Sequence, residues 1–342
     1  MQFNSTQIAA FDYCEPPKFM SSDEIELQLS SVYERLKLPF GRLELQTGIK
    51  SRGIWPIGTL PSDIATQAAQ NLIKKNNIPT HEIDLLIHAS VCRDFLEPAT
   101  ASNVHRNLGL DSKTQIFDLS NACLGVMNSF LVAASMIEAG TIKSALIVSG
   151  ENSGPLLNET FQFLCNNLEL NRKTIKSYIA NLTIGSAGVA FYLTHKSLRS
   201  GQSLKFASIS TDSMANKLCL GSGDTHGLMM QTESEELLIA GIKLALHNFS
   251  KFQNISKWST SDYGLVLSHQ VGVAHRDLLF KTLELPLEKD FSTFPQYGNT
   301  GSAALPLTFC KAFEAGRMNP GTKIAMLGIG SGLSSIMVGV EC

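Results

Sequence analysis

The sequence predicts an α/β protein made of two similar halves, each a mixed sheet with helices on its faces. Segments 138–149 and 314–328 both begin with Glu-Ala-Gly at the end of an apolar helix and then continue into an apolar strand of the parallel-sheet kind. Cys123 stands 15 residues before the first Glu-Ala-Gly, and Asn299 stands 15 residues before the second. We therefore expect an internal duplication, with the halves stacked about a pseudo-twofold axis.

Composition narrows the class of protein. A chain of 342 residues with 44% hydrophobic content can bury a large core, and a net charge of −2 disfavours an extended basic face for nucleic acid. The seven cysteines are scattered without Cys-x-x-Cys pairs, which argues against a disulfide framework and a metal site. The sequence shows no signal peptide and no apolar run of the ~18 residues that span a bilayer. We expect a soluble, cytoplasmic protein.

In the first half, short apolar strands are predicted over residues 85–89 and 115–119, and an apolar helix over 124–139. Cys123 falls at the corner between the second strand and the helix. Unpaired backbone N–H groups and the helix dipole favour a thiolate at such a corner, so the sequence indicates a nucleophile there. A buried structural thiol is the alternative interpretation.

The first half contains an insertion that the second half lacks. Residues 152–180 are rich in Leu, Phe and Asn, and a long insertion of this kind is usually a lid or an interface element. A strand over 185–194 then completes the half. We place the first half at residues 1–197 and the second at 198–342.

The second half repeats the pattern of the first. A capping box at residues 232–235 predicts the start of a helix that runs to about residue 249. A buried strand over 265–269 brings His269 to its carboxyl end, the sheet edge where sites form in α/β proteins. The last strand is predicted over 333–340.

Stacking the halves would bring Cys123 and Asn299 together, with His269 joining them from the adjacent strand. Such a trio suits carbon–carbon bond formation between thioesters. The thiolate takes one acyl group, and the His and Asn side chains hydrogen-bond the carbonyl oxygen of a second thioester as enolate charge develops.

Three motifs resemble the active-site motifs of the thiolase superfamily, and most closely its β-ketoacyl-acyl-carrier-protein synthase III branch. They are Asn-Ala-Cys at 121–123, Ser-His-Gln-Val at 268–271 and Gly-Asn-Thr-Gly-Ser-Ala at 298–303. The resemblance runs from about residue 5 to the C-terminus. It implies a five-layered αβαβα fold, Cys123 as acyl acceptor, and His269 with Asn299 as the oxyanion hole for the second thioester. It also implies coenzyme A thioesters as substrates, no permanently bound cofactor, and a homodimer.

A glycine turn near the C-terminus is implied to hold the first thioester oxygen, together with the backbone N–H of the cysteine. Gly-Ser-Gly at 330–332 occupies that place, which assigns Ser331 and Gly332 to this role. A dinucleotide-binding glycine loop is disfavoured because the segment leads into a β-rich run and not a helix.

Glu97 narrows the branch further. In the initiating synthases this position is usually a phenylalanine that reaches into the partner's pocket, whereas a glutamate before Pro98 is similar to the OleA-type head-to-head condensing enzymes. There it acts from the neighbouring subunit as the base that removes an α-proton. Malonyl thioesters form their carbanion by losing carbon dioxide, but an ordinary acyl thioester needs a base. A solvated surface carboxylate is the alternative interpretation.

Coenzyme A recognition must differ from that of the initiating synthases, because residues 41–49 lack both the adenine-stacking tryptophan and the arginine before Thr-Gly-Ile. Lys50, Arg52 and Arg42 are candidate phosphate partners, and ordinary solvated cations are the alternative. Met229 and Met230 are candidates for lining an acyl channel, since thioethers adapt to flexible chains. Core packing is the alternative for both.

Three functions follow, in order of preference. The first is head-to-head Claisen condensation of two fatty acyl-coenzyme A thioesters to a β-keto acid. The second is decarboxylative condensation of an acyl thioester with malonyl-acyl-carrier-protein. The third, from a different class, is a non-catalytic acyl-binding scaffold; the intact Cys123, His269 and Asn299 argue against it.

Overall fold

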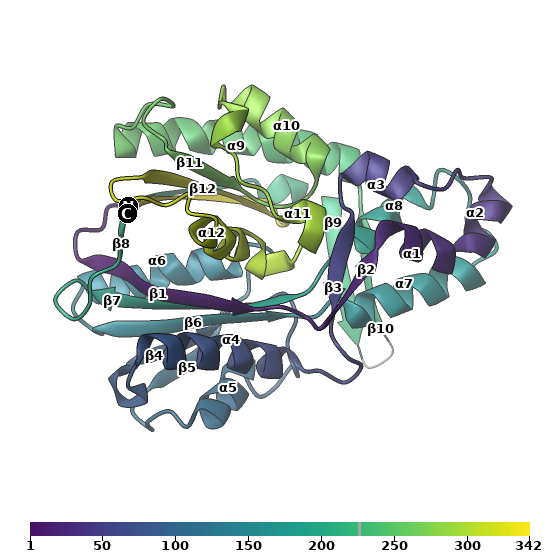
Figure 1. Cartoon of the computed structure of the whole chain (residues 1–342). Coiled ribbons are helices and arrows are strands. Elements are labelled where there is room, and N and C mark those ends of the chain that lie inside the picture. The colour runs from purple at the N-terminus through teal and green to yellow at the C-terminus, as the bar shows by residue number, and fades with distance from the viewer. Residues whose placement is uncertain (225–226) are drawn as a thin grey trace.

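The computed structural model describes residues 1–224 and 227–342, arranged in five layers (Figure 1). Two sheets enclose a middle layer of two helices, and two further helices cover the outer face of each sheet. The thiolase-like fold class is thereby confirmed. The helices of the layers are α4 (Pro61–Asn76) and α5 (Thr100–Leu108) on one outer face, α9 (Ser234–Ser256) and α10 (Val273–Thr282) on the other, and α6 (Gly125–Glu138) and α12 (Ala304–Glu314) in the middle.

Each half contributes its own set of strands. The first half supplies β1 (Thr6–Cys14), β4 (Leu85–His88), β5 (Gln115–Asp118), β6 (Ser144–Glu151) and β7 (Ala187–His195). The second half supplies β8 (Gln202–Thr211), β11 (Leu265–Ser268), β12 (Lys323–Gly330) and β13 (Ser334–Glu341). Their spatial order is β11-β12-β13-β8-β1-β7-β6-β4-β5, because β1 pairs with β8 over two residues and so joins the sheets.

The internal duplication is visible in this order. In each half one strand pairs in parallel with the next, β4 with β6 and β11 with β12, and an antiparallel strand follows, β7 or β13. The counterpart of β5 in the second half is reduced to one parallel bridge between Val266 and Asp290. The domain boundary at residue 197 falls between β7 and β8 and stays a prediction.

Burial explains the continuous apolar runs in the sequence. Every residue of β4 and β6 is buried, since helices cover both faces of their sheet. Helix α6 is apolar on nearly all sides because it lies between the sheets, where Phe130 packs in the same core as Leu305 and Phe309 of α12.

An arm projects from the layered body, on the right in Figure 1. It has a separate core in which Ile25 and Leu29 pack with Leu157 and Leu164 of the predicted insertion. A β-hairpin packs against this insertion. The elements of the arm and hairpin are α1 (Ser22–Gln28), α2 (Ser30–Leu36), α3 (Arg42–Thr47), α7 (Gly154–Asn166), α8 (Lys176–Ile179), β2 (Lys18–Ser21), β3 (Ser51–Ile54), β9 (Cys219–Asp224) and β10 (Gly227–Thr232).

Short elements complete the chain. They are α11 (Phe294–Tyr297) and the 3-10 turns η1 (Thr80–Glu82), η2 (Ala180–Thr183), η3 (Ser213–Leu218), η4 (Leu287–Lys289) and η5 (Gly301–Ala303). Among the described residues, no helix has both the length and the apolar character needed to cross a membrane.

The predicted capping box of α9 is wrong. The helix begins at Ser234, one residue after a cap position whose side chain makes no capping hydrogen bond. Thr232 instead ends β10, and its hydroxyl donates to the sulfur of Cys219 at 3.5 Å across the hairpin. The helix also continues beyond residue 249 to Ser256, because Phe252 packs into the outer core of the second half.

Candidate active site

The strand-to-helix corner at Cys123 is confirmed. Strand β5 ends at Asp118 and α6 begins at Gly125, so Cys123 lies in the tight turn between them. Ala122 has a φ of +45°, in the left-handed region that non-glycine residues rarely adopt. A strained residue directly before a candidate nucleophile is typical of turns that present a reactive side chain.

The turn that carries Asn299 is attached to this corner. Ser302, three residues after Asn299, accepts a hydrogen bond at 2.9 Å from the backbone N–H of Val126 in the first turn of α6. This contact satisfies one of the free N–H groups at the start of the helix. It also joins two segments that lie far apart in the sequence.

The strand end that carries His269 approaches from the other side. His269 directly follows β11, as predicted, and its backbone N–H donates to the carbonyl of Leu327 in β12 at 3.0 Å. Strand β12 then passes Leu124, the neighbour of Cys123, so closely that a Cβ on Gly330 would lie 2.8 Å from Leu124 Cγ. The segments bearing the three predicted catalytic residues therefore meet at one place.

The hydrogen bonds of Asn299 fix the orientation of its amide. Its Oδ1 accepts from the backbone N–H of Gly301 at 3.1 Å. An N–H donor must face the carbonyl oxygen of an amide and not its NH₂ group. The Nδ2 atom of the buried Asn299 is consequently left as a hydrogen-bond donor for another group.

His269 is an uncharged imidazole at neutral pH. Burial, reinforced by His275, lowers the pKa of His269 to about 3, and burial lowers the pKa of His275 to about 4. Within the described residues the His269 ring makes no hydrogen bond. The neutral ring carries one N–H group, which it can donate to a substrate oxygen.

The expectation of a stabilised thiolate at Cys123 is wrong for the substrate-free protein. Burial, and after it the carboxylate of Glu151, raise the pKa of the Cys123 thiol to about 12. They outweigh the backbone N–H of Cys123, which by itself lowers the pKa of the thiol. The resting nucleophile is a neutral thiol, and its proton must leave during the reaction.

Glu151 is the residue of this site that sequence reasoning missed. It is the last residue of β6 and is only 3% exposed, yet it lies close enough to Cys123 to affect its thiol. The available signal was a carboxylate that ends a continuous apolar strand at the sheet edge where sites form.

Glu97 lies on the exposed loop between β4 and α5. Within the described residues its carboxylate makes no hydrogen bond or ion pair. The loop itself is fastened by Asp94, which accepts from the backbone N–H of Ser62 and from the amide of Asn103, both at 2.9 Å.

The turn with Ser331 and Gly332 connects β12 to β13 directly beyond Gly330. Gly332 has a φ of +124°, a conformation that L side chains rarely adopt. Since Gly330 packs on Leu124, this turn lies beside the Cys123 corner. Its part in holding a thioester oxygen stays a prediction.

Arg52 does not meet the requirements of a phosphate partner. It is completely buried, and its guanidinium donates to Ser22 Oγ at 3.1 Å from both terminal nitrogens and to Met20 O at 3.4 Å. Its guanidinium is therefore not accessible to a phosphate group of coenzyme A. Lys50 is exposed and Arg42 half-buried, so both keep an accessible cation.

Met229 and Met230 lie half-buried on β10, opposite the insertion. The amide of the buried Asn181 contacts the sulfur of Met229 at 3.6 Å and donates to the carbonyl of Met230 at 3.0 Å. The methionines thus line the junction of hairpin and arm, and their contact with an acyl chain stays a prediction.

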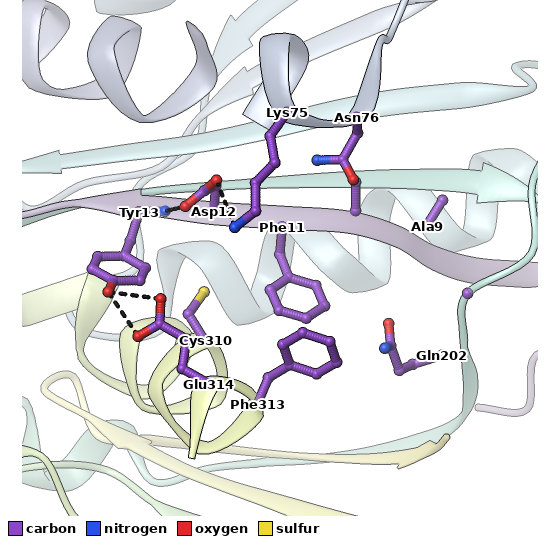
Figure 2. Close-up of a pocket in the computed structure, with 12 residues that line it drawn as sticks. Ala9, Phe11, Asp12, Tyr13, Lys75, Asn76, Gln202, Cys310, Phe313 and Glu314 are labelled. Carbon is purple, nitrogen blue, oxygen red and sulfur yellow. Dashed lines mark hydrogen bonds and ion pairs between the residues drawn. The ribbon is translucent and has the colours of Figure 1, made fainter. Parts of the chain in front are cut away.

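A cleft of about 170 Å³ opens elsewhere, between β1, α4 and α12 (Figure 2). Phe11 and Phe313 form its apolar floor, and an ion pair of 3.3 Å between Lys75 and Asp12 lies at its rim. The lining includes neither Cys123, His269 nor Asn299, so the cleft is separate from the candidate site. The described residues contain no cluster of side chains suited to hold a metal ion.

Comparison with known proteins agrees with this geometry. A family model for 3-oxoacyl-[acyl-carrier-protein] synthase III matches residues 117–168, and the model for the C-terminal part of that family matches residues 254–341. The chain is 34% identical to the acyl-CoA:acyl-CoA alkyltransferase of Shewanella oneidensis, with 100% of both chains covered. It is also 34% identical to that of Xanthomonas campestris, with 99% of both chains covered.

Solved structures of Xanthomonas campestris OleA are similar over the whole chain. A variant with lauric acid and lauroyl-CoA bound has a TM-score of 0.94 at 33% identity and covers 99% of this chain and 100% of its own. A variant with a glutamate replaced by glutamine has a TM-score of 0.95 at 33% identity, covering 100% of this chain and 98% of its own. Fold, site and relatives define an acyltransferase of the thiolase superfamily. The chain belongs to the acyl-CoA:acyl-CoA alkyltransferase (OleA) family.

Proposed function

We propose that the protein condenses two fatty acyl-coenzyme A thioesters head to head, through an acyl group carried on Cys123, to a β-keto acid. The main support for this proposal is the position of Glu97. This residue has an exposed carboxylate, and it lies on a loop that Asp94 fastens to α4. Glu97 and Cys123 also have the same separation along the chain as the glutamate and the cysteine replaced in the OleA structures.

The first step transfers an acyl group to the cysteine. The sulfur of Cys123 attacks the thioester carbonyl, a new carbon–sulfur bond forms, and the bond to coenzyme A breaks. The thiol proton passes to the departing sulfur, which leaves as free coenzyme A. The backbone N–H of Cys123 and the turn at Ser331 and Gly332 stabilise the oxyanion of this step.

The second step forms the carbon–carbon bond. The partner's Glu97 removes an α-proton from the second acyl thioester, and His269 and Asn299 Nδ2 donate hydrogen bonds to the enolate oxygen. The α-carbon attacks the acyl carbonyl on Cys123, and the carbon–sulfur bond breaks. The cysteine sulfur regains a proton from Glu97. Hydrolysis of the resulting β-ketoacyl thioester by one water gives the β-keto acid and a second coenzyme A.

A homodimer supplies Glu97 to the neighbouring site in this proposal. The loop around Glu97 exposes the large apolar side chains of Val91, Phe95 and Leu96, and Leu96 is 91% exposed. Ile57, which is 97% exposed, and Leu60 precede α4, to which Asp94 fastens this loop. Strand β5 ends the sheet, so its outer edge is open to pair with a strand of a second copy.

The remaining parts of the proposal concern substrate delivery and compartment. Lys50 and Arg42 provide accessible cations for the phosphates of coenzyme A. The insertion at 152–180 covers the acyl chain together with Met229 and Met230. All seven cysteines are free thiols, which fits the reducing cytoplasm.

Product analysis tests the reaction. Incubation with myristoyl-coenzyme A alone should give a β-keto acid built from two acyl chains, with release of two molecules of coenzyme A for each product. Labelled carbon dioxide from malonyl-acyl-carrier-protein, with no product from myristoyl-coenzyme A alone, would contradict the proposal and assign the protein to decarboxylative condensation, the activity named by its family models.

Mixed dimers test the contribution of Glu97 across the interface. Cys123→Ser and Glu97→Gln proteins should each be inactive in condensation. A dimer with one subunit of each kind has one site that combines an intact Cys123 with an intact partner's Glu97, and should be active. Mixed dimers as inactive as their parents would show that Glu97 does not act between subunits.

A further inference from the structure

Glu151 is a buried carboxylate without a cationic partner among the described residues. Its Oε1 accepts from the backbone N–H groups of Val91 and Ser302, each at 2.9 Å, and its Oε2 accepts from that of Cys92 at 3.2 Å. Burial raises the pKa of Glu151, and these N–H donors oppose that rise. A buried carboxylate held mainly by backbone donors is costly, and its removal would leave several polar groups unpaired.

The donors belong to two functional segments. Val91 and Cys92 begin the loop that leads to Glu97, and Ser302 lies in the turn directly after Asn299. Ser302 in turn accepts from Val126 at the start of α6. The carboxylate of Glu151 thus connects the loop that leads to Glu97 with the turn that follows Asn299. Through Ser302 this turn is joined to the start of α6, the helix that follows Cys123.

The turn after Asn299 is shaped to fit this carboxylate. Gly301 has a φ of +58°, and a Cβ on it would lie 2.9 Å from Glu151 Oε1. A side chain here would displace the carboxylate or the turn. Ser302, whose N–H donates to Glu151 Oε1, accepts from Val126 three residues beyond Cys123, so the carboxylate lies near the corner that carries the thiol. Among the described residues, the thiols of Cys92 and Cys219 are further titratable groups that affect these two residues.

We propose that Glu151 is a positioning residue for the condensation: its carboxylate holds the Asn299 turn and the loop leading to Glu97 against the Cys123 corner, and places a negative charge beside the thiol. The positioning half of this inference rests on the proposed function. A displacement of about 1 Å in such a site costs about a hundredfold in rate, so these contacts matter for turnover.

Glu151→Gln separates the two effects. The amide has nearly the same volume, keeps one acceptor oxygen, replaces the other with an NH₂ group that faces an N–H donor, and removes the charge. We expect kcat for condensation of myristoyl-coenzyme A to fall at least about tenfold with KM within about twofold. The rate of Cys123 alkylation by iodoacetamide at pH 8 should rise at the same time, because the thiolate is no longer repelled.

Glu138→Gln is the matched control. Glu138 lies at the opposite end of α6 and also accepts from backbone N–H groups, those of Asn4 and Ser5, at 3.1 and 2.7 Å. Its replacement should leave both the condensation rate and the alkylation rate of Cys123 unchanged.

The outcomes decide the inference. Condensation by Glu151→Gln within twofold of the wild type would overturn the positioning role, and an unchanged alkylation rate would overturn the placement of the charge. If Glu151→Gln unfolds, Glu151→Asp tests the same contacts, since it keeps the charge but is one methylene shorter. It should lower kcat and leave alkylation unchanged, and wild-type kcat would overturn the inference. A wild-type protein that condenses nothing would contradict the proposed function alone, because alkylation still reports on Glu151.

Discussion

The hydroxyl of Ser302 accepts a hydrogen bond at 2.9 Å from the backbone N–H of Val126, and this contact joins the corners of the two duplicated halves. Both residues are completely buried. The duplicated fold alone would place the two corners near one another. This hydrogen bond fixes how the turn with Asn299 lies on the helix that begins beyond Cys123.

Ser302→Ala should therefore lower activity as well as stability. Removing the hydroxyl leaves the Val126 N–H buried without an acceptor, at a cost of about 1–3 kcal/mol in the free energy of unfolding. We expect condensation to slow about tenfold in protein that is still folded. Urea unfolding and initial rates measure the two effects. Ser129→Ala is the control, because Ser129 is equally buried on α6 and, within the part of the chain that the structure describes, bonds to Gly125 O of its own helix alone. Equal rates for the two variants would refute the coupling.

Asn299→Asp should separate acylation from condensation. The carboxylate can still accept from the Gly301 N–H, but the Nδ2 donor becomes an oxygen that repels enolate charge. Loss of one oxyanion-hole donor costs about 10²–10³-fold in rate. We expect a loss of this size in condensation, with acylation of Cys123 still visible by intact-protein mass spectrometry. A variant that condenses normally would exclude Asn299 from the oxyanion hole.

The buried histidine beside His269 should make the fold sensitive to acid. The pKa of His275 is about 4 in the folded protein and about 6.5 when unfolded, so the unfolded chain binds more protons between these values. Stability is thus fully present above pH 6.5 and is lost as pH falls toward 4, by about 1.4 kcal/mol per pH unit. Urea unfolding of wild type and His275→Gln should show their stability difference shrinking at this rate below pH 6. A pH-independent difference would contradict the prediction.

The resting thiol should react slowly at neutral pH. Because the pKa of Cys123 is about 12, its thiolate fraction should grow about tenfold per pH unit throughout pH 7–10. Iodoacetamide labelling of the Cys123 peptide, followed by mass spectrometry, should therefore accelerate over this whole range. A plateau that begins below pH 9 would show that the start of α6 stabilises the thiolate after all.

Local sequence patterns predicted the parts of this protein that local physics controls. The corner at Cys123, the strand that ends before His269 and the repeated Glu-Ala-Gly segments all follow from apolar periodicity and fixed spacing. The cap of α9 failed because Thr232 is engaged by Cys219 in the hairpin, a partner that no local pattern reveals.

The charge and burial of the side chains inside the site could not be predicted from the sequence. Glu151 acquires its role through contacts with Val91, Cys92 and Ser302, all distant along the chain, and no spacing rule connects these positions. The thiol of Cys123 was expected to ionise easily because a helix start is a local feature. The burial that reverses this expectation is a property of the assembled halves.

The central claim is that Cys123 carries the acyl group and that Glu97 acts only afterwards, in the condensation step. The most direct test is the intact mass of the Glu97→Gln protein after incubation with myristoyl-coenzyme A, read together with product formation. We expect one myristoyl group on Cys123, release of one coenzyme A and no β-keto product. Glu97→Gln protein that forms product at the wild-type rate, or that gains no acyl mass on Cys123, would contradict this claim.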